Sequence, residues 1–418
     1  MLLKRKNYAK KLCESIILIL IISKANGQEI DTIKNDVFSL HAQTTIINQF
    51  KPAFRANYNG ENSLSSSEEN KISITSTIFL GINLWKNASV FISPEIGGGS
   101  GLSGSLGVGA STNGETYRIA NPAPAFELGR LYFKQIFSDF SFTIGKVSIS
   151  DYFDNNKYSH DPRTQFMSWA LMSNSAWDYP ANTKGYTPSI ILEYTTPKNE
   201  LRYAFSLVST TPNGMIMNWN INEAGSHTLE YTYKWNNGAL RLLSFFTTAN
   251  MGNYDESILL NSISPNIHDT EKQGRTKYGF GINYEQEITK NIGVFFRTSW
   301  NDGRNETWEF TEIDRSISIG ISSNGNQWNR KNDNIGLAYV ISGLSTSHRN
   351  YLQAGGMGFE LGDGNLNYGL EQFIEIYYSL GLTKNIYTSG AYQFIMNPGY
   401  NKDRGPVNVF SIRLHVII

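Results

Sequence analysis

The chain has 418 residues, of which 40% are hydrophobic, and it carries 36 basic and 36 acidic side chains. This balance offers no basic surface for a nucleic acid. The single cysteine, Cys13, excludes a disulfide framework and a thiolate metal site. A chain of this length usually folds into two or three soluble domains, but no linker, repeat or block of charge divides the sequence.

The first residues are typical of a secretory signal peptide. Five basic side chains precede an apolar run over 16–22, and Ala25-Asn26-Gly27 follows as a small-x-small cleavage pattern. No later stretch approaches the roughly 18 apolar residues that a transmembrane helix requires. We therefore predict a signal peptide over 1–27 and one domain over 28–418. Removal of the signal leaves 30 basic and 35 acidic side chains, which further argues against nucleic acid.

The next feature along the chain is an alternation of apolar and polar residues with a period of two. It begins over 72–84 and returns over 201–207, 278–284 and 410–418, which indicates strands with one apolar face. A barrel with lipid outside and water inside produces this pattern, although a soluble sandwich also alternates. Charged residues in these segments fall on the opposite parity: Glu193, Arg202, Glu230, Lys234, Arg241, Arg297, Glu375 and Arg413.

The connections between the alternating segments decide between the two folds. Turns of a few residues near 86, 138, 197, 236, 290 and 384 alternate with long segments, as in bacterial outer-membrane barrels. One connection, over 322–333, is longer than the turn expected there, so we expect one strand boundary to need revision. The sequence thus predicts an all-β fold: a single transmembrane, antiparallel, up-and-down β-barrel of about 16 strands, with long extracellular loops and short periplasmic turns.

A glycine-rich stretch over 97–114 contains Gly99, Gly101 and Gly104 in the spacing of a dinucleotide-binding fingerprint. A phosphate-binding glycine turn must open a helix, and no helical period follows here. We interpret the stretch as a flexible loop that packs against the inner wall or bends over a pore.

Candidate catalytic groups are sparse. Glu309 with Glu312, or Asp151 with Asp154, would supply two carboxylates for glycoside hydrolysis, but charged pairs in a water-filled barrel are the simpler interpretation. No G-x-S-x-G elbow is present, and the six histidines lack the spacing of a zinc-binding helix. We expect no catalytic residue, no metal and no cofactor.

The most distinctive segment runs from Gly145 to Arg163 and mixes carboxylates, cations, amides and aromatic rings. Sugars bind to such mixtures, because their hydroxyls exchange hydrogen bonds with polar groups while their C–H faces stack on rings. A polar surface loop held by local turns is the alternative interpretation.

This segment resembles a signature stretch of the carbohydrate-selective porins of the OprB type. Matching positions within it include Phe153, Asp154, His160, Asp161 and Arg163. Further matching stretches are Pro94-Glu95-Ile96, Arg130-Leu131, Asn301-Asp302-Gly303 and Asn397-Pro398, and together the matches extend from about Leu40 to His415.

The resemblance implies a 16-stranded channel that passes sugars by facilitated diffusion, with loops and a polar constriction narrowing its lumen. Strand parity places Glu95, Arg130 and Lys134 on the lumen side. Lys146 has the parity of lipid-facing residues and reaches the lumen only if Gly145 distorts its strand. The other constriction candidates lie in the signature segment and just beyond it: Asp151, Asp154, His160, Asp161, Arg163 and Trp169.

The interpretation that follows is a porin of the bacterial outer membrane that admits carbohydrates and performs no chemistry. Its expected partners are sugars, outer-membrane lipid and the barrel-assembly machinery during biogenesis. The resemblance implies a monomer, with a trimer as the alternative. Two other functions stay open at this point: a barrel enzyme acting on lipid or glycan, and a closed barrel serving adhesion or structure. Conductance with sugar block would support the porin, and turnover in detergent would support the enzyme.

Processing gives the first testable prediction. Because Ala25 and Gly27 follow the apolar run, cleavage should leave Gln28 as the first residue of the mature protein. N-terminal sequencing of protein from the outer-membrane fraction measures this directly, and material that began at Met1 would contradict it.

Overall fold

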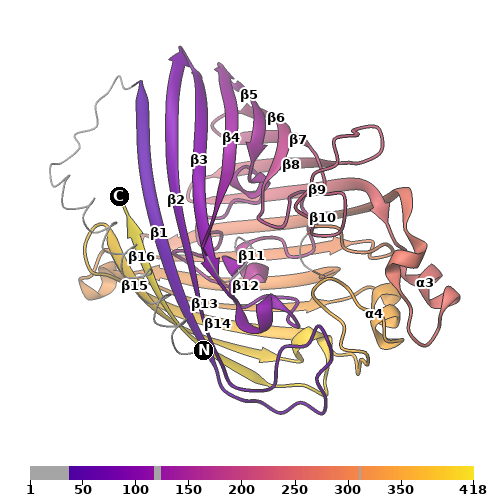
Figure 1. Cartoon of the computed structure of the whole chain (residues 1–418). Helices are drawn as coiled ribbons and strands as arrows, with labels where there is room; N and C mark the ends of the chain where they lie inside the picture. The colour runs from indigo at the N-terminus through magenta and orange to yellow at the C-terminus, as the bar shows by residue number, and fades with distance from the viewer. Residues whose placement is uncertain (1–36, 117–123, 310–311) are drawn as a thin grey trace.

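The computed structural model describes residues 37–116, 124–309 and 312–418, so the predicted signal peptide lies outside the described residues. Sixteen antiparallel strands form one closed barrel, in which each strand pairs with its neighbours in sequence and β1 pairs with β16. Figure 1 shows the strands in chain order from β1 in indigo to β16 in yellow. The predicted fold class and strand number are confirmed.

The first eight strands are β1 (Phe38–Lys51), β2 (Glu69–Trp85), β3 (Ala88–Gly99), β4 (Ala125–Phe137), β5 (Phe140–Val147), β6 (Thr187–Thr195), β7 (Asn199–Ser206) and β8 (Gly225–Trp235). The other eight are β9 (Gly238–Met251), β10 (Lys272–Thr289), β11 (Ile292–Asn301), β12 (Arg315–Asn324), β13 (Asn334–Gly343), β14 (Glu371–Gly381), β15 (Ile386–Met396) and β16 (Val407–Ile417).

The helices are short and lie in the loops and turns. They are η1 (Leu102–Ser105), η3 (Ile149–Asp151), α2 (Trp169–Met172), α3 (Tyr254–Leu260), η4 (Ile267–Thr270), η5 (Gly325–Trp328), α4 (Thr346–Gln353) and η6 (Pro398–Tyr400). Within the described ranges, none of these helices has the length and apolar character needed to cross a membrane.

The period-two pattern separates the two faces of the wall as predicted. On β2, Ile72 and Ile78 point outward and are about half exposed, whereas Ser73, Thr75 and Thr77 point inward and are buried. An apolar outer face suits lipid, and a polar inner face suits a lumen. The eight charged residues assigned to the inner face all lie there, and all but Lys234 are buried or nearly so.

The short turns lie where the sequence predicts them. Asn87 and Asn237 adopt positive φ angles of 62° and 68° in two of these turns, a conformation that asparagine tolerates well in tight hairpins. The connection after β12 is a genuinely long turn that contains η5, and Asp333 at its end accepts hydrogen bonds from Arg330 and Tyr378. We expected one strand boundary there to need revision, and this expectation is wrong. Strands β12 and β13 end and begin where the alternation of the sequence places them.

The interior of the barrel is largely filled by the long loops. An empty 16-strand barrel would be a wide aqueous channel. Instead, Phe166 and Leu361 from two loops pack with Phe373 on the inner wall, and Phe153 and Trp177 form a second apolar cluster against the wall between β6 and β9. The loops therefore form an internal plug, which leaves only part of the cross-section to solutes.

The outward orientation of the apolar face can be tested at Phe280 of β10, which is 53% exposed on the outer surface. Phe280→Arg should lower the free energy of unfolding by about 2–4 kcal/mol if the residue lies near the bilayer midplane. Phe280→Leu keeps an apolar side chain and serves as the control. Unfolding in lipid vesicles measures both, and equal stabilities of the two variants would contradict a lipid-facing Phe280.

Candidate functional site: a charged constriction

The plug segment over 148–186 is held to the wall by buried charges. Arg297 on β11 is 1% exposed, and it donates to the carbonyls of Leu171 at 2.9 Å and Ser159 at 2.6 Å. Its Nε lies 3.4 Å from Oδ1 of Asp154, which also accepts a hydrogen bond of 2.6 Å from the Asn283 amide. Because a buried guanidinium needs several acceptors, this contact fixes the course of the segment.

Two further wall residues hold the same segment by its backbone. Glu375 on β14 accepts the N–H groups of Met167 and Ser168 at 2.6 and 2.9 Å. Arg413 on β16 donates to two carbonyl groups of segment 162–165 at 2.6 and 2.8 Å. Charge-assisted hydrogen bonds of this kind are about twice as strong as neutral ones, so the plug is firmly held to the strands from β11 to β16.

The glycine-rich loop is also fastened to the inner wall. The N–H groups of Gly109 and Ala110 donate to the carboxylate of Glu371 at 3.2 and 2.7 Å. The only helical turn in this stretch is η1, and its φ and ψ angles are not helical throughout. The loop therefore opens no helix for a phosphate, in agreement with its interpretation as backbone packed on the wall.

Glu95 is a residue of β3, and its side chain points into the barrel toward the plug. It is 2% exposed, and it accepts hydrogen bonds from Tyr186 at 3.0 Å and from Arg163 at 3.3 Å. Arg163 also donates to Glu115 at 2.8 Å. Parity placed Glu95 correctly on the lumen side, and its carboxylate joins wall and plug.

Arg130 on β4 and Asp151 in η3 form an ion pair between the wall and the plug. The Arg130 guanidinium donates to both Asp151 oxygens, at 2.6 and 2.8 Å. It lies over the rings of Phe79 and Tyr186, with its Cζ 5.1 and 5.2 Å from their centroids. The Asp151 side chain is 40% exposed. A bidentate pair held between two rings is rigid, and its exposed part is the Asp151 carboxylate.

Lys134 forms a second pair, nearer the short turns. Its ammonium lies 2.7 Å from Glu193 on β6, and Glu193 also contacts Arg202 at 3.2 Å and Ser141 at 2.7 Å. The side chain of Lys134 is about one quarter exposed. This pair is therefore also accessible from the lumen.

Lys146 does reach the lumen side, where it pairs with Glu127 at 2.7 Å, and Lys184 of the plug approaches the same carboxylate at 3.4 Å. Gly145 has a φ of 139°, so the strand is distorted immediately before Lys146. A side chain at position 145 would lie 2.3 Å from the Leu131 carbonyl, which explains why this position is glycine.

The other sequence candidates lie within the plug. Burial and the nearby Arg297 charge lower the pKa of His160. Asp161 accepts the Arg163 N–H at 3.0 Å in a local turn. Trp169 on α2 is 4% exposed and stacks on Tyr179 with ring centroids 5.4 Å apart. These three residues, like Asp154, shape the plug from within, whereas the side chains of Asp151, Lys134 and Lys146 are at least one quarter exposed.

The alternation in the sequence did not identify Glu127 as a lumen-facing residue, although Glu127 belongs to this site. The pairing of β3 with β4 shifts between Ser93 and Pro94, so that β4 carries one extra residue at Gly129. Glu127 and Arg130 therefore both face inward although their parities differ. The glycine at 129 is the only signal in the sequence, and by itself it does not identify a bulge.

The carboxylate pairs considered for hydrolysis have other partners. Glu309 accepts the Ser209 N–H at 3.1 Å, and Glu312 accepts the Leu361 N–H at 2.6 Å. Burial raises the pKa of both groups, and both fasten outer loops. Among the described residues, no group of three or more His, Cys, Asp or Glu side chains is arranged to hold a metal ion.

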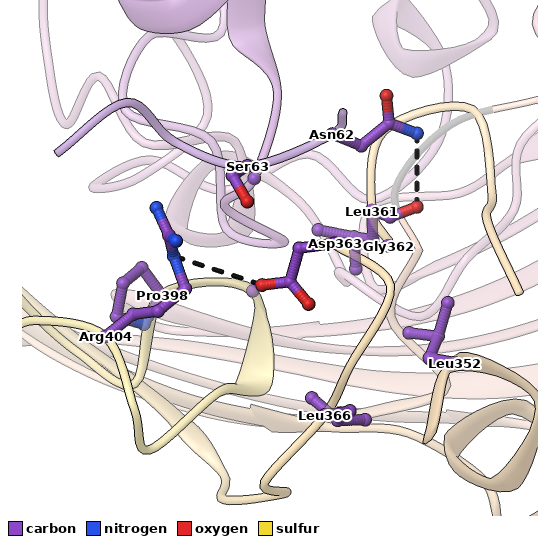
Figure 2. A pocket seen from close by; sticks show the side chains of 11 residues that line it. Asn62, Ser63, Leu352, Leu361, Gly362, Asp363, Leu366, Pro398 and Arg404 are labelled. Carbon is purple, nitrogen blue, oxygen red and sulfur yellow. Dashed lines mark hydrogen bonds and ion pairs between the residues drawn. The ribbon is translucent and has the colours of Figure 1, made fainter. Parts of the chain in front are cut away.

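Three loops at the long-loop end of the barrel meet around a small cavity, which Figure 2 shows from close by. Asn62 donates to the Leu361 carbonyl at 3.2 Å, and Arg404 lies 4.0 Å from Asp363. The cavity between them has a volume of about 10 Å³, which is enough for one water molecule. A sugar cannot enter there, so the accessible pairs between β3 and β6 border the better candidate for a passage.

A closed barrel with an apolar exterior and a charged, narrowed interior defines a channel of the bacterial outer membrane. The family model for carbohydrate-selective porins of the OprB family matches residues 70–417, and the chain belongs to this family. It is a carbohydrate-selective porin and not an enzyme.

Solved structures agree on the fold. The high-pH structure of Pseudomonas putida OprB has a TM-score of 0.73 at 14% identity, with 91% of this chain and 94% of that chain covered. The outer membrane channel DcaP of Acinetobacter baumannii has a TM-score of 0.55 at 10% identity, with 91% and 97% covered. A sequence comparison with curated proteins found no match.

The anchoring of the plug can be tested at Arg297. Arg297→Ala should lower the free energy of unfolding by about 3–5 kcal/mol, because Asp154 then lies buried without its cation. Arg315→Ala is the control, since Arg315 is exposed on the adjacent strand. Urea unfolding in detergent measures both, and a loss no larger than that of the control would contradict the anchor.

Proposed function

We propose that sugars diffuse down their gradient through a passage bordered by three ion pairs: Arg130–Asp151, Lys134–Glu193 and Lys146–Glu127. The observation that carries the proposal is that each cation contacts a carboxylate at 2.6–2.8 Å while part of each pair stays accessible. Each cation largely neutralises the charge of its carboxylate partner. The passage therefore offers hydrogen-bonding groups but no strong electrostatic attraction for ions of either sign. That combination suits a neutral, hydroxyl-rich solute.

The proposed mechanism requires contacts that are weak and exchangeable. A porin performs no work, so tight binding at one place would only slow exit. The charged groups are already satisfied by one another, and a sugar hydroxyl therefore gains only the difference between a new hydrogen bond and the contact with water that it replaces. Such a site can select by shape and hydrogen bonding without retaining the sugar.

We infer that the passage is complete within one chain. Each of the three pairs joins residues of the same barrel, which supports a monomer as the functional unit and leaves a trimer as an assembly of independent channels. Export by the signal peptide over 1–27 and insertion by the barrel-assembly machinery complete the proposed biogenesis.

Arg130 tests the proposed passage. Arg130→Ala should raise the single-channel conductance, because the largest side chain of the pair is removed, and it should weaken the block of that conductance by sugars, because a donor is lost. The difference should be about threefold to tenfold in the blocking concentration, as expected for the net contribution of one typical hydrogen bond.

Arg130→Lys is the matched control, since it keeps the charge but not the bidentate geometry. It should retain the ion preference and lose part of the sugar block. Recordings that show no sugar block in the unmutated protein, or equal block in Arg130→Ala, would refute the proposed constriction.

A further inference from the structure

An arginine ends a lipid-facing column of residues on the outer face of the barrel. Arg315 is the first residue of β12, at the end of the strand that joins a long loop, and it is exposed. Below it on the same face lie Ile317 and Ile319, which are about half exposed. In the strand register Arg315 pairs with Trp300 of β11, and aromatic residues form girdles where a barrel passes from lipid to water. Arg315 therefore lies at the level of the lipid headgroups of the outer leaflet.

A second arginine reaches the same face from the loop between β13 and β14. Gly343 pairs with Arg315 in the register, so a Cβ atom there would point outward; it would lie 2.6 Å from Leu370, 2.9 Å from the Tyr368 hydroxyl and 3.6 Å from Cγ of Arg315. Tyr368 and Arg315 therefore share the outer side of the wall. Arg349 belongs to α4 at the loop end of the barrel (Figure 1), and its Cζ lies 5.3 Å from the centroid of the Tyr368 ring. The two guanidinium groups thus flank one tyrosine.

A lysine from the loop between β15 and β16 adds to this positive charge. Lys402 is exposed, and its side chain passes over Gly369, where a Cβ atom would lie 2.8 Å from Cγ of Lys402. The acidic residue next to it is Asp403, which accepts a hydrogen bond from Asn367 at 3.1 Å. Three cations beside one carboxylate leave this part of the rim positive. Arg315, Arg349 and Lys402 are called the rim cluster below.

The cations of the rim cluster form no ion pair with any described residue. In this they differ from the lumen cations Arg130 and Lys134, whose carboxylate partners lie at 2.6 and 2.7 Å. A guanidinium presents five N–H donors, and the apolar and aromatic side chains around Arg315 supply no acceptor for them. A phosphate does, because its oxygens accept two parallel hydrogen bonds from one arginine. The rim cluster is therefore suited to an external anion of this kind.

We propose that the rim cluster binds a phosphate group carried by a lipid of the outer leaflet. A lipid is favoured over a soluble anion because Arg315 continues the lipid-facing column of β12. The acyl chains of a bound lipid then lie along Ile317 and Ile319 while its phosphate reaches Arg315 and Arg349. Basic clusters next to membrane-spanning segments recognise anionic headgroups in this way. The site lies on the outer face, so the inference is independent of the sugar passage proposed for the lumen.

Native mass spectrometry of the protein in detergent tests the site. The probe is bisphosphorylated lipid A, a glycolipid that carries both acyl chains and phosphate groups, titrated against the unmutated protein and the double variant Arg315→Gln/Arg349→Gln. Glutamine keeps a polar side chain and removes the charge. The double variant should bind the first lipid A molecule about tenfold more weakly, as expected when charge-assisted hydrogen bonds to a phosphate are lost.

Lys290→Gln/Lys384→Gln is the matched control, because it removes the same net charge from two exposed lysines in the short turns at the opposite end of the barrel. It should bind lipid A as the unmutated protein does. Arg315→Lys/Arg349→Lys keeps the charge without the bidentate geometry and should bind with intermediate affinity. Single-channel conductance should stay the same in all these variants, since the lumen is unaltered, and this also shows that the variant barrels have folded.

Two further probes separate the sources of the phosphate. Lipid A without its phosphates should bind equally weakly to the unmutated protein and to the arginine double variant. Inorganic phosphate should compete with lipid A only at concentrations far above that of the lipid, because it lacks the acyl chains. Competition at equal concentrations would refute the lipid as the source of the phosphate. Equal binding of bisphosphorylated lipid A by the unmutated protein and the double variant, or an equal loss in the lysine control, would refute the site itself.

Discussion

The internal structure of this barrel depends on hydrogen bonds between charged side chains of the inner wall and the backbone of the loops that fold inward. Arg297 and Arg413 donate to loop carbonyls, and Glu371 and Glu375 accept loop N–H groups. A backbone segment buried inside a barrel loses its contacts with water, so each of its polar groups needs a partner. The wall charges supply these partners, and the loop backbone in turn compensates the buried charges.

This arrangement divides the charged residues of the lumen into two groups. Those bonded to loop backbone are almost completely buried and lie on the inner wall, where they hold the plug. Those paired with other side chains between β3 and β6 remain partly accessible. In the proposed passage these cations and carboxylates neutralise one another, which favours neutral sugars over ions of either sign.

The agreement with Pseudomonas putida OprB at only 14% identity has a simple physical basis. A strand between lipid and lumen requires apolar residues on one parity and polar residues on the other, and many sequences satisfy that requirement. The fold therefore persists when most side chains differ. The contacts of the plug depend much more on particular residues than the strands do. Each contact is a hydrogen bond between one charged side chain of the wall and one segment of loop backbone.

The sequence alone determined the barrel, its strand number, its short turns and the inward orientation of residues such as Glu95, Arg130 and Lys134, because period-two alternation is a local property of each strand. It could not determine which lumen residues meet. The Gly129 bulge turns Glu127 inward, Gly145 lets Lys146 reach it, and the packing of the plug buries Trp169 against Tyr179. The resemblance singled out segment 145–163, much of which folds into the barrel, but it could not separate Asp151, whose side chain is 40% exposed, from Asp154, which is completely buried. Those distinctions come from contacts between residues distant in sequence, and only the closed barrel with its loops folded inside brings them together.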